Sequence, residues 1–173
     1  MNRRRPRPVS KRALVIGTAS LVVAGTIGAG VSFAGPEHKP QPKRATKTQI
    51  AGLFNTWNAT LRTGDAEKVA DLYADNAVLL PTVSNKIRTD HAGIVDYFEH
   101  FLANKPVGKK LTTIVTVLDD NSAIDTGIYQ FTLTDPKTGA KSVVKARYSY
   151  EYEKQRDGDW KIVNHHSSKM PEG

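Results

Sequence analysis

The residues best able to do chemistry lie near the C-terminus, on either side of a predicted turn at 157–158. The dipeptide Asp-Gly at this position is a typical two-residue hairpin signal. With the turn there, Glu151 lies opposite Asn164. Arg147 and His166 share that face, because cross-strand partners project to the same side and side chains alternate with a period of two. A guanidinium, a carboxylate, an amide and an imidazole are therefore expected to form one cluster.

We expect this face to line the interior of the domain, because the same alternation places Trp160 and Ile162 on it. A few polar groups within an otherwise apolar cavity are typical of a small-ligand site. We therefore predict that the cluster, together with Tyr97 from a preceding helix, binds a small polar or anionic ligand. An ion pair between Arg147 and Glu151 beside a hydrogen-bonded imidazole would explain the same residues without a ligand, and both interpretations stay open.

Three tyrosines occupy the opposite face of the same hairpin. Tyr148, Tyr150 and Tyr152 alternate onto it, beside Val163 and His165. A sheet face this aromatic is unusual if it is left to solvent. We expect it to form a dimer contact. Coverage by the C-terminal tail or by loops of the same chain is the alternative.

Neither a metal nor a cofactor is expected. His165 and His166 are adjacent on a predicted strand and point to opposite faces, so they cannot chelate one ion together. His91 and His100 are nine residues apart on a predicted helix, roughly 180° around it at about 100° per residue. The chain contains no cysteine, and no dinucleotide or flavin fingerprint is visible.

Enzymatic activity is left open, with no catalytic residue assigned. Acid–base catalysis would need a pocket carboxylate with a tyrosine or a protonated acid opposite it. Asp75, Asp90, Asp125 and Tyr97 are candidates, but their spacing selects no pair. A serine nucleophile elbow is missing, since no G-x-S-x-G motif occurs. A binding module is therefore favoured over an enzyme.

The distribution of charge argues against nucleic acid as a partner. The 173 residues carry a net charge of +8. Residues 1–47 hold ten basic residues and one acid, a net +9, whereas residues 48–173 hold fifteen and sixteen, a net −1. The positive charge thus belongs to the N-terminal segment, and the remaining chain lacks the basic footprint of a nucleic-acid-binding domain.

The N-terminal segment has the order of a secretory signal. Six basic residues within 1–12 precede an uncharged stretch over 13–31, and a small–x–small pattern ends at Ala34. We expect residues 1–34 to direct export to the cell envelope or the exterior, with cleavage near Ala34. Retention of 13–31 as a single membrane anchor is the alternative. Residues 35–47, rich in Pro and Lys, are predicted to be a disordered tether.

Helices come first in residues 48–173, and strands follow. Apolar spacing predicts a helix over 48–63, a short helix after Asp65 and a third after 89–90. The expected strands span 77–83, 111–119, 122–134, 140–155 and 159–168. This order favours an α+β domain, with three helices packed on one face of a curved antiparallel sheet.

Three stretches of this domain resemble the nuclear transport factor 2-like superfamily. Residues 54–57, 64–65 and 72–78 are similar to its opening, where a helix, a Gly-Asp turn and a Y-A-x-D-A step lead into the first strand. Residues 88–98 look like its third helix. The sequence D-G-D-W-K-I-V-N-H-H-S-S-K-M-P at 157–171 resembles one branch. That branch is the association domain of calcium/calmodulin-dependent protein kinase II, with its bacterial SgcJ/EcaC-type relatives.

The resemblance covers about 48–171 and implies a cone with a pocket between helices and sheet, assembled into dimers or larger rings. It implies no kinase chemistry, and the sequence contains no kinase motif. The basic pocket of the kinase's domain is matched only in part, because Asn164 replaces one of its two histidines and Glu151 falls near its arginine. The resulting hypothesis is an exported module that associates with itself and binds a small ligand. The alternative is a SnoaL- or ketosteroid isomerase-like isomerase, cyclase or hydrolase acting on a lipophilic or polyketide-like molecule.

Overall fold

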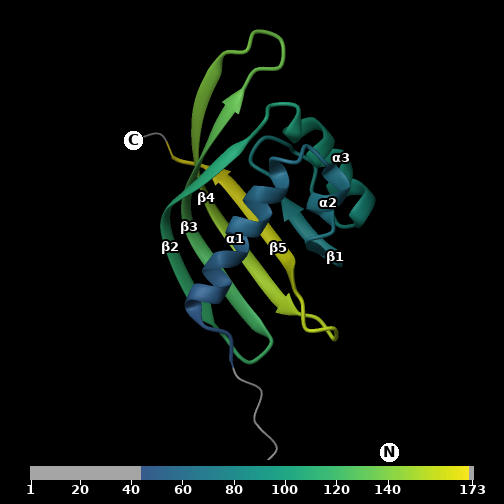
Figure 1. Cartoon of the computed structure of the whole chain (residues 1–173), viewed down its shortest axis with the longest axis vertical. Helices are drawn as coiled ribbons and strands as arrows, with labels where there is room; N and C mark the ends of the chain where they lie inside the picture. The colour runs from purple at the N-terminus through teal and green to yellow at the C-terminus, as the bar shows by residue number, and fades with distance from the viewer. Residues whose placement is uncertain (1–43, 172–173) are drawn as a thin grey trace, which may run out of the picture. The chain divides into compact units, whose positions relative to one another are not determined.

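The computed structural model describes residues 44–171 of the chain, which contain three helices and five strands (Figure 1). The helices are α1 (Lys47–Leu61), α2 (Ala66–Ala70) and α3 (His91–Leu102). The strands are β1 (Tyr73–Leu80), β2 (Val107–Val117), β3 (Ser122–Thr134), β4 (Lys141–Lys154) and β5 (Trp160–Lys169).

The strands form one curved sheet in the order β1-β5-β4-β3-β2, with the helices against one of its faces (Figure 1). The sheet does not close on itself, because β1 and β2 are its two edges. Strands β2 to β5 pair antiparallel, as predicted, whereas β1 pairs with β5 in parallel. The α+β class is therefore confirmed, and the prediction of a purely antiparallel sheet is wrong at β1. That strand also begins earlier than the predicted 77–83.

The predicted export signal at 1–34 lies outside the described residues, as does most of the predicted tether. The last residues assigned to the tether belong to the domain instead. Arg44 forms an exposed ion pair with Asp120, and Thr46 caps α1 through a capping box with Gln49. Within the described part of the chain, no helix is both long and apolar enough to cross a membrane.

Helices α2 and α3 begin at the aspartates that the sequence indicates. The side chain of Asp65 accepts a hydrogen bond from the amide of Lys68, and that of Asp90 accepts one from the amide of Gly93. Both are N-caps, because a short carboxylate satisfies an amide that has no partner in the first turn. Gly64, with φ of +72°, separates α1 from α2.

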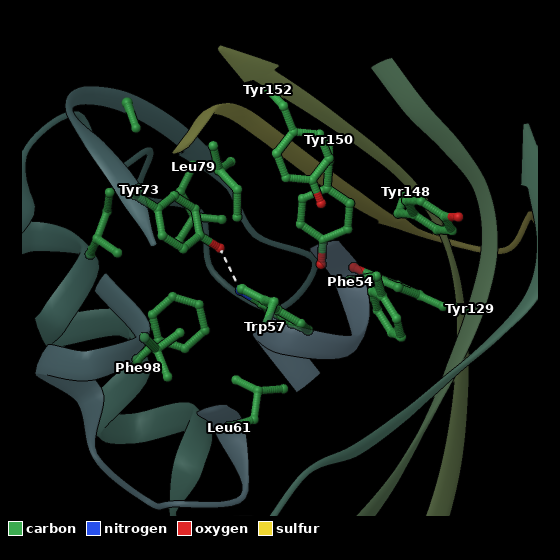
Figure 2. Close-up of a cluster of buried hydrophobic side chains, with 14 of the residues drawn as sticks. Phe54, Trp57, Leu61, Tyr73, Leu79, Phe98, Tyr129, Tyr148, Tyr150 and Tyr152 are labelled. Atoms are coloured by element: carbon green, nitrogen blue, oxygen red, sulfur yellow. Dashed lines mark hydrogen bonds between the residues drawn. The ribbon is translucent and has the colours of Figure 1, made fainter. Parts of the chain in front are cut away.

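An aromatic core fills the space between α1 and the sheet (Figure 2). Phe54 and Trp57 of α1 point into it from one side. Tyr148 and Tyr150 of β4 meet them from the other, with ring centroids 6.5 Å apart for Phe54–Tyr148 and 5.7 Å for Trp57–Tyr150. Aromatic pairs at such separations contribute beyond the area they bury, about 0.5–1.5 kcal/mol each.

The tyrosine face of β4 is thus the inner face of the sheet. Tyr148, Tyr150 and Tyr152 are all buried against elements of their own chain. The prediction that this face forms a dimer contact is wrong, because α1 covers it. The alternative was coverage by the C-terminal tail or by loops of the same chain. The face is indeed covered by its own chain, but the main covering element is the helix α1.

A buried ion pair lies on the same inner face, between β2 and β3. The ammonium of Lys110 donates to Asp125 at 2.8 Å and to the carbonyl of Ala51 at 2.8 Å. The other oxygen of Asp125 accepts from the hydroxyl of Tyr148 at 2.9 Å. Lys110 faces inward because the pairing of β2 with β3 shifts by one residue at Leu111. Such a β-bulge reverses the alternation of side chains along a strand.

Candidate ligand-binding site

A cavity of about 200 Å³ opens between α3, the end of β1 and the inner face of the sheet. Its walls are mainly apolar, and its aromatic wall residues include Trp57, Phe98, Phe101 and Phe131. Its polar lining residues are Thr82, Tyr97, Asn104, Tyr129, His165 and Ser167. A mainly apolar pocket with a few converging polar groups is the usual form of a small-molecule site.

A chain of hydrogen bonds at the base of this cavity holds His165 in one tautomer. The indole N–H of Trp57 donates to the hydroxyl oxygen of Tyr73 at 3.1 Å. The Tyr73 hydroxyl lies 2.9 Å from Nδ1 of His165. If Nδ1 carried the proton, the Tyr73 oxygen would accept twice and leave its own buried hydrogen without an acceptor, which is costly. Tyr73 therefore donates to Nδ1, and the proton of His165 sits on Nε2.

The chain continues from His165 to the cavity wall. Nε2 of His165 lies 3.5 Å from the hydroxyl of Tyr129, which donates to Oγ of Ser167 at 2.6 Å. Oγ of Ser167 is in turn hydrogen-bonded to the hydroxyl of Thr82. These side chains form one polar strip on an otherwise aromatic wall. Tyr129 comes from β3, His165 and Ser167 come from β5, and Thr82 follows the end of β1.

Burial sets the ionisation of two of these groups. Burial lowers the pKa of His165 from 6.5 to about 3, with a smaller contribution from the neighbouring His166. The ring of Tyr150 stacks on His165 with centroids 4.1 Å apart, which excludes water from the imidazole. Burial also raises the pKa of Tyr97 to about 12. Both groups are therefore uncharged near neutral pH.

We predict that His165 makes the domain less stable in mild acid. Below pH 6.5 the unfolded chain binds a proton on His165 that the folded chain does not bind until about pH 3. The free energy of unfolding should therefore fall by about 2 kcal/mol between pH 7 and pH 5, since each pKa unit corresponds to about 1.4 kcal/mol. Urea unfolding at these two values measures the difference.

The matched control uses the neighbouring histidine. His165→Gln should remove most of the pH dependence, whereas His166→Gln, at an exposed position, should leave it unchanged. The aspartates whose pKa is lowered by hydrogen bonds, Asp65, Asp119 and Asp135, lose their contribution only below about pH 4, outside this window. An equal pH dependence in wild type and His165→Gln would contradict the prediction.

The predicted pairing of the last two strands is confirmed for the candidate cluster. Arg147 pairs with Ser168, and Glu151 pairs with Asn164. Arg147, Glu151 and His166 are nevertheless exposed on the outer face of the sheet, and Asn164 is half-buried there. The prediction that these four residues line the interior is wrong. Their binding of a small ligand stays a prediction, now for the outer face.

Two one-residue differences explain the inverted orientation. The amide of Gln155 donates to the carbonyl of Asp159, so the hairpin loop has three residues, 156–158, where the sequence suggests two. A bulge at Val163 then restores the predicted pairing farther along β5. Ile162, between the loop and the bulge, points inward as its apolar character indicates, but residues beyond the bulge alternate in the opposite sense.

Tyr97 is the one predicted site residue that lines the cavity. The sequence did not identify Thr82, Tyr129 or Ser167 as site residues. The stripe of tyrosines with His165 marks their side of the sheet, but its alternation from the predicted two-residue turn places it on the outer face. Among residues 44–171 no cluster of three potential metal ligands occurs.

The sheet, the three helices over one face and the cavity between them define a nuclear transport factor 2-like domain. The chain belongs to the calcium/calmodulin dependent protein kinase II association domain family, whose sequence model matches residues 46–171. None of the curated proteins is similar enough to this chain to count as a match.

Solved bacterial structures agree with this assignment. A Xanthomonas campestris protein that carries the name of the same association domain is 56% identical, with a TM-score of 0.72 over 75% of this chain and 91% of that one. A nuclear transport factor 2-like protein from Salmonella enterica is 16% identical, with a TM-score of 0.63 over 73% and 92%. A ketosteroid isomerase-like protein from Erwinia carotovora is 13% identical, with a TM-score of 0.61 over 73% and 97%. The last two show similarity of fold alone.

Proposed function

We propose that this chain is an exported association module, which pairs through the outer face of its sheet and binds a small molecule in the cavity beneath α3. Membership of the association-domain family carries the first part of the proposal. The mainly apolar cavity with its converging hydroxyls and imidazole supports the second. The two functions occupy opposite faces of one sheet, so each can be tested by substitutions that leave the other in place.

The outer face of the sheet is the proposed association surface. One row of paired residues crosses four strands, from Ile114 of β2 through Thr126 and Ser149 to His166 of β5. Ile114 is 61% exposed although it is apolar. Apolar residues mixed with polar ones in this way are typical of the surfaces of proteins that pair with each other.

Arg147 and Glu151 add opposite charges to the same surface. They lie on either side of Ser149 on β4. A second copy related by a two-fold axis that passes over Ser149 at right angles to β4 would therefore place the Arg147 of one copy near the Glu151 of the other. This arrangement gives the predicted site residues a role in association.

Sedimentation of the full chain tests association directly. We expect a dimer or a larger assembly at tens of micromolar, and Ile114→Lys should weaken association at least tenfold by replacing an exposed apolar contact of the surface with a charge. Ile87→Lys is the matched control, because Ile87 is 54% exposed but lies in the loop between β1 and α3. A wild-type monomer, or equal weakening by both substitutions, would reject the proposed surface.

Export is the part of the proposal that rests on residues 1–34 alone. We expect cells that express the full chain to release a mature protein whose first residue is Gly35, the position after the small–x–small pattern. N-terminal sequencing of the purified protein provides the measurement. A protein that keeps residues 13–31 and sediments with membranes would favour the anchor instead.

A catalytic function of the ketosteroid isomerase kind receives no support from the cavity. That chemistry needs a carboxylate near the substrate. None of the lining residues, all within the described part of the chain, is an aspartate or a glutamate. Asp125, one of the candidates from the sequence, is held by Lys110 and Tyr148 away from the cavity.

A further inference from the structure

One hydroxyl hydrogen of the polar strip in the cavity has no acceptor among the described residues. Tyr129 donates to Ser167, so the oxygen of Ser167 already accepts one bond. Ser167 and Thr82 share a single hydrogen bond, which uses one of their two hydroxyl hydrogens. Among the described residues no acceptor takes the other hydrogen. Whichever of the two hydroxyls keeps it, the cavity presents one donor at this point.

The walls around this donor carry no charge that could offset an anion. No lysine or arginine is among the lining residues of the cavity, all of which belong to residues 44–171. The guanidinium of Arg88, in an adjoining pocket that shares Tyr97 with the cavity, donates to Asp96 at 3.0 Å and to two backbone carbonyls. His165 is neutral because burial depresses its pKa. A carboxylate placed here would lose its hydration and gain no opposite charge, so it should bind far more weakly than an uncharged molecule of the same shape.

The size of the cavity limits the ligand to about one ring. Apolar cavities of about 150 Å³ accept a benzene-sized molecule, whereas drug-sized ligands occupy roughly 300 Å³ or more. The volume of about 200 Å³ lies just above the first value. Phe98, Phe101 and Phe131 offer ring faces and edges on which a flat molecule can pack.

From these observations we propose that the cavity binds an uncharged, single-ring apolar molecule whose acceptor oxygen, such as a carbonyl, takes the free hydrogen of the Thr82–Ser167 pair. The inference rests on the proposed ligand-binding function and specifies the chemical class of the ligand. It also departs from the sequence-based expectation of a polar or anionic ligand, because the arginine on which that expectation depended lies on the other face of the sheet.

Four probes of nearly equal size separate the contributions of charge and of the acceptor oxygen. Benzamide and benzoate differ in charge, and acetophenone and ethylbenzene differ in the carbonyl. Titrations of the full chain, followed by calorimetry and by amide chemical shifts, should show binding of benzamide and acetophenone. We expect benzoate to bind at least 100-fold more weakly than benzamide, and ethylbenzene to bind about threefold to tenfold more weakly than acetophenone.

Two variants localise the binding. Substituting one hydroxyl would free the hydrogen of its neighbour, and without Tyr129 the Nε2 hydrogen of His165 would be free. The informative variant is therefore the quadruple change Thr82→Val, Ser167→Ala, Tyr129→Phe and His165→Leu, which removes every donor of the strip. Acetophenone should then bind no better than ethylbenzene. Ala146→Leu, which fills the cavity from β4, should abolish binding of all probes. Val144→Phe, at a half-buried lining position, serves the same purpose if the first variant does not fold.

The outcomes distinguish the two proposals. If none of the four probes binds, or if cavity filling leaves their binding unchanged, the proposed binding function fails together with this inference. If benzoate binds as tightly as benzamide, or if the quadruple variant keeps the preference for acetophenone, the cavity is a binding site but the proposed ligand class is wrong.

Discussion

Replacing Lys110 by methionine is expected to lower the free energy of unfolding by about 3–5 kcal/mol, measured by urea unfolding at pH 7. The side chain of Asp125 is fully buried, and Lys110 is its cationic partner at 2.8 Å. Without that partner, a carboxylate remains in the aromatic core with one hydrogen bond from Tyr148. Removing one member of a buried pair costs far more than the pair contributes, because the other charge is left uncompensated.

A second substitution separates this explanation from a simple loss of packing. In the double variant Lys110→Met/Asp125→Leu no charge remains, and most of the lost stability should return. The Tyr148 hydroxyl would still have the carbonyl of Thr112, at 3.3 Å, as an acceptor. Arg44→Met breaks an exposed pair, with the Arg44 side chain 64% exposed, and should change stability by less than about 1 kcal/mol. A double variant no more stable than Lys110→Met would contradict the explanation.

Replacing Gly127 by alanine should destabilise the sheet by at least about 3 kcal/mol. A β-carbon at this position would lie 2.0 Å from the carbonyl oxygen and 2.7 Å from the carbonyl carbon of Thr112. Both atoms belong to the backbone of the neighbouring strand, so the contact is relieved only if β2 and β3 separate. The bulge at Leu111 lies one residue before Thr112, so the substitution should also disturb the inward placement of Lys110.

Gly52→Ala is the control for the loss of a glycine. Gly52 lies within α1, and a β-carbon there would meet nothing within 4 Å. Alanine should be neutral or stabilise α1 by up to about 1 kcal/mol, because glycine is a poor helix former. Thermal and urea unfolding of both variants provide the comparison. A loss of less than about 1 kcal/mol for Gly127→Ala would show that the two strands accommodate the methyl group.

Features with short-range causes could be predicted from the sequence. Asp65 and Asp90 cap helices because a carboxylate one turn from a free amide is a local interaction. The hairpin of β4 and β5 forms where a glycine with φ of +97°, Gly158, permits the turn. The pairs of Arg147 with Ser168 and of Glu151 with Asn164 are those that a two-residue turn predicts, because the longer loop and the bulge at Val163 offset each other.

The direction of the same side chains could not be predicted in this way. The loop is one residue longer than predicted, and the bulge at Val163 compensates for it, so the pairs beyond the bulge are as predicted. Ile162, which lies between the loop and the bulge, therefore faces the opposite side of the sheet from those pairs. An extra residue in a strand leaves no distinct mark in the sequence. It is selected because Ile162 and Tyr152 can then both pack inside, which is a property of the whole core.

The candidate cavity depended even more on contacts between distant segments. Tyr73 and His165 are 92 positions apart, and Thr82 and Ser167 are 85 apart, yet each pair is hydrogen-bonded. No local spacing could join them. The parallel pairing of β1 with β5 brings them together, and it depends on how α2 and α3 pack beside the sheet.

By itself, the sequence determined the α+β class, the three helices, the position of the last hairpin and the resemblance to the association-domain family, because these follow from capping, alternation, turn chemistry and family motifs. Only the tertiary structure decided that the tyrosines face α1, that the arginine cluster faces outward and that a neutral polar strip lines the cavity. The physical reason is that a side chain's face is chosen by the burial of the whole core, and single-residue bulges let each strand conform to that choice.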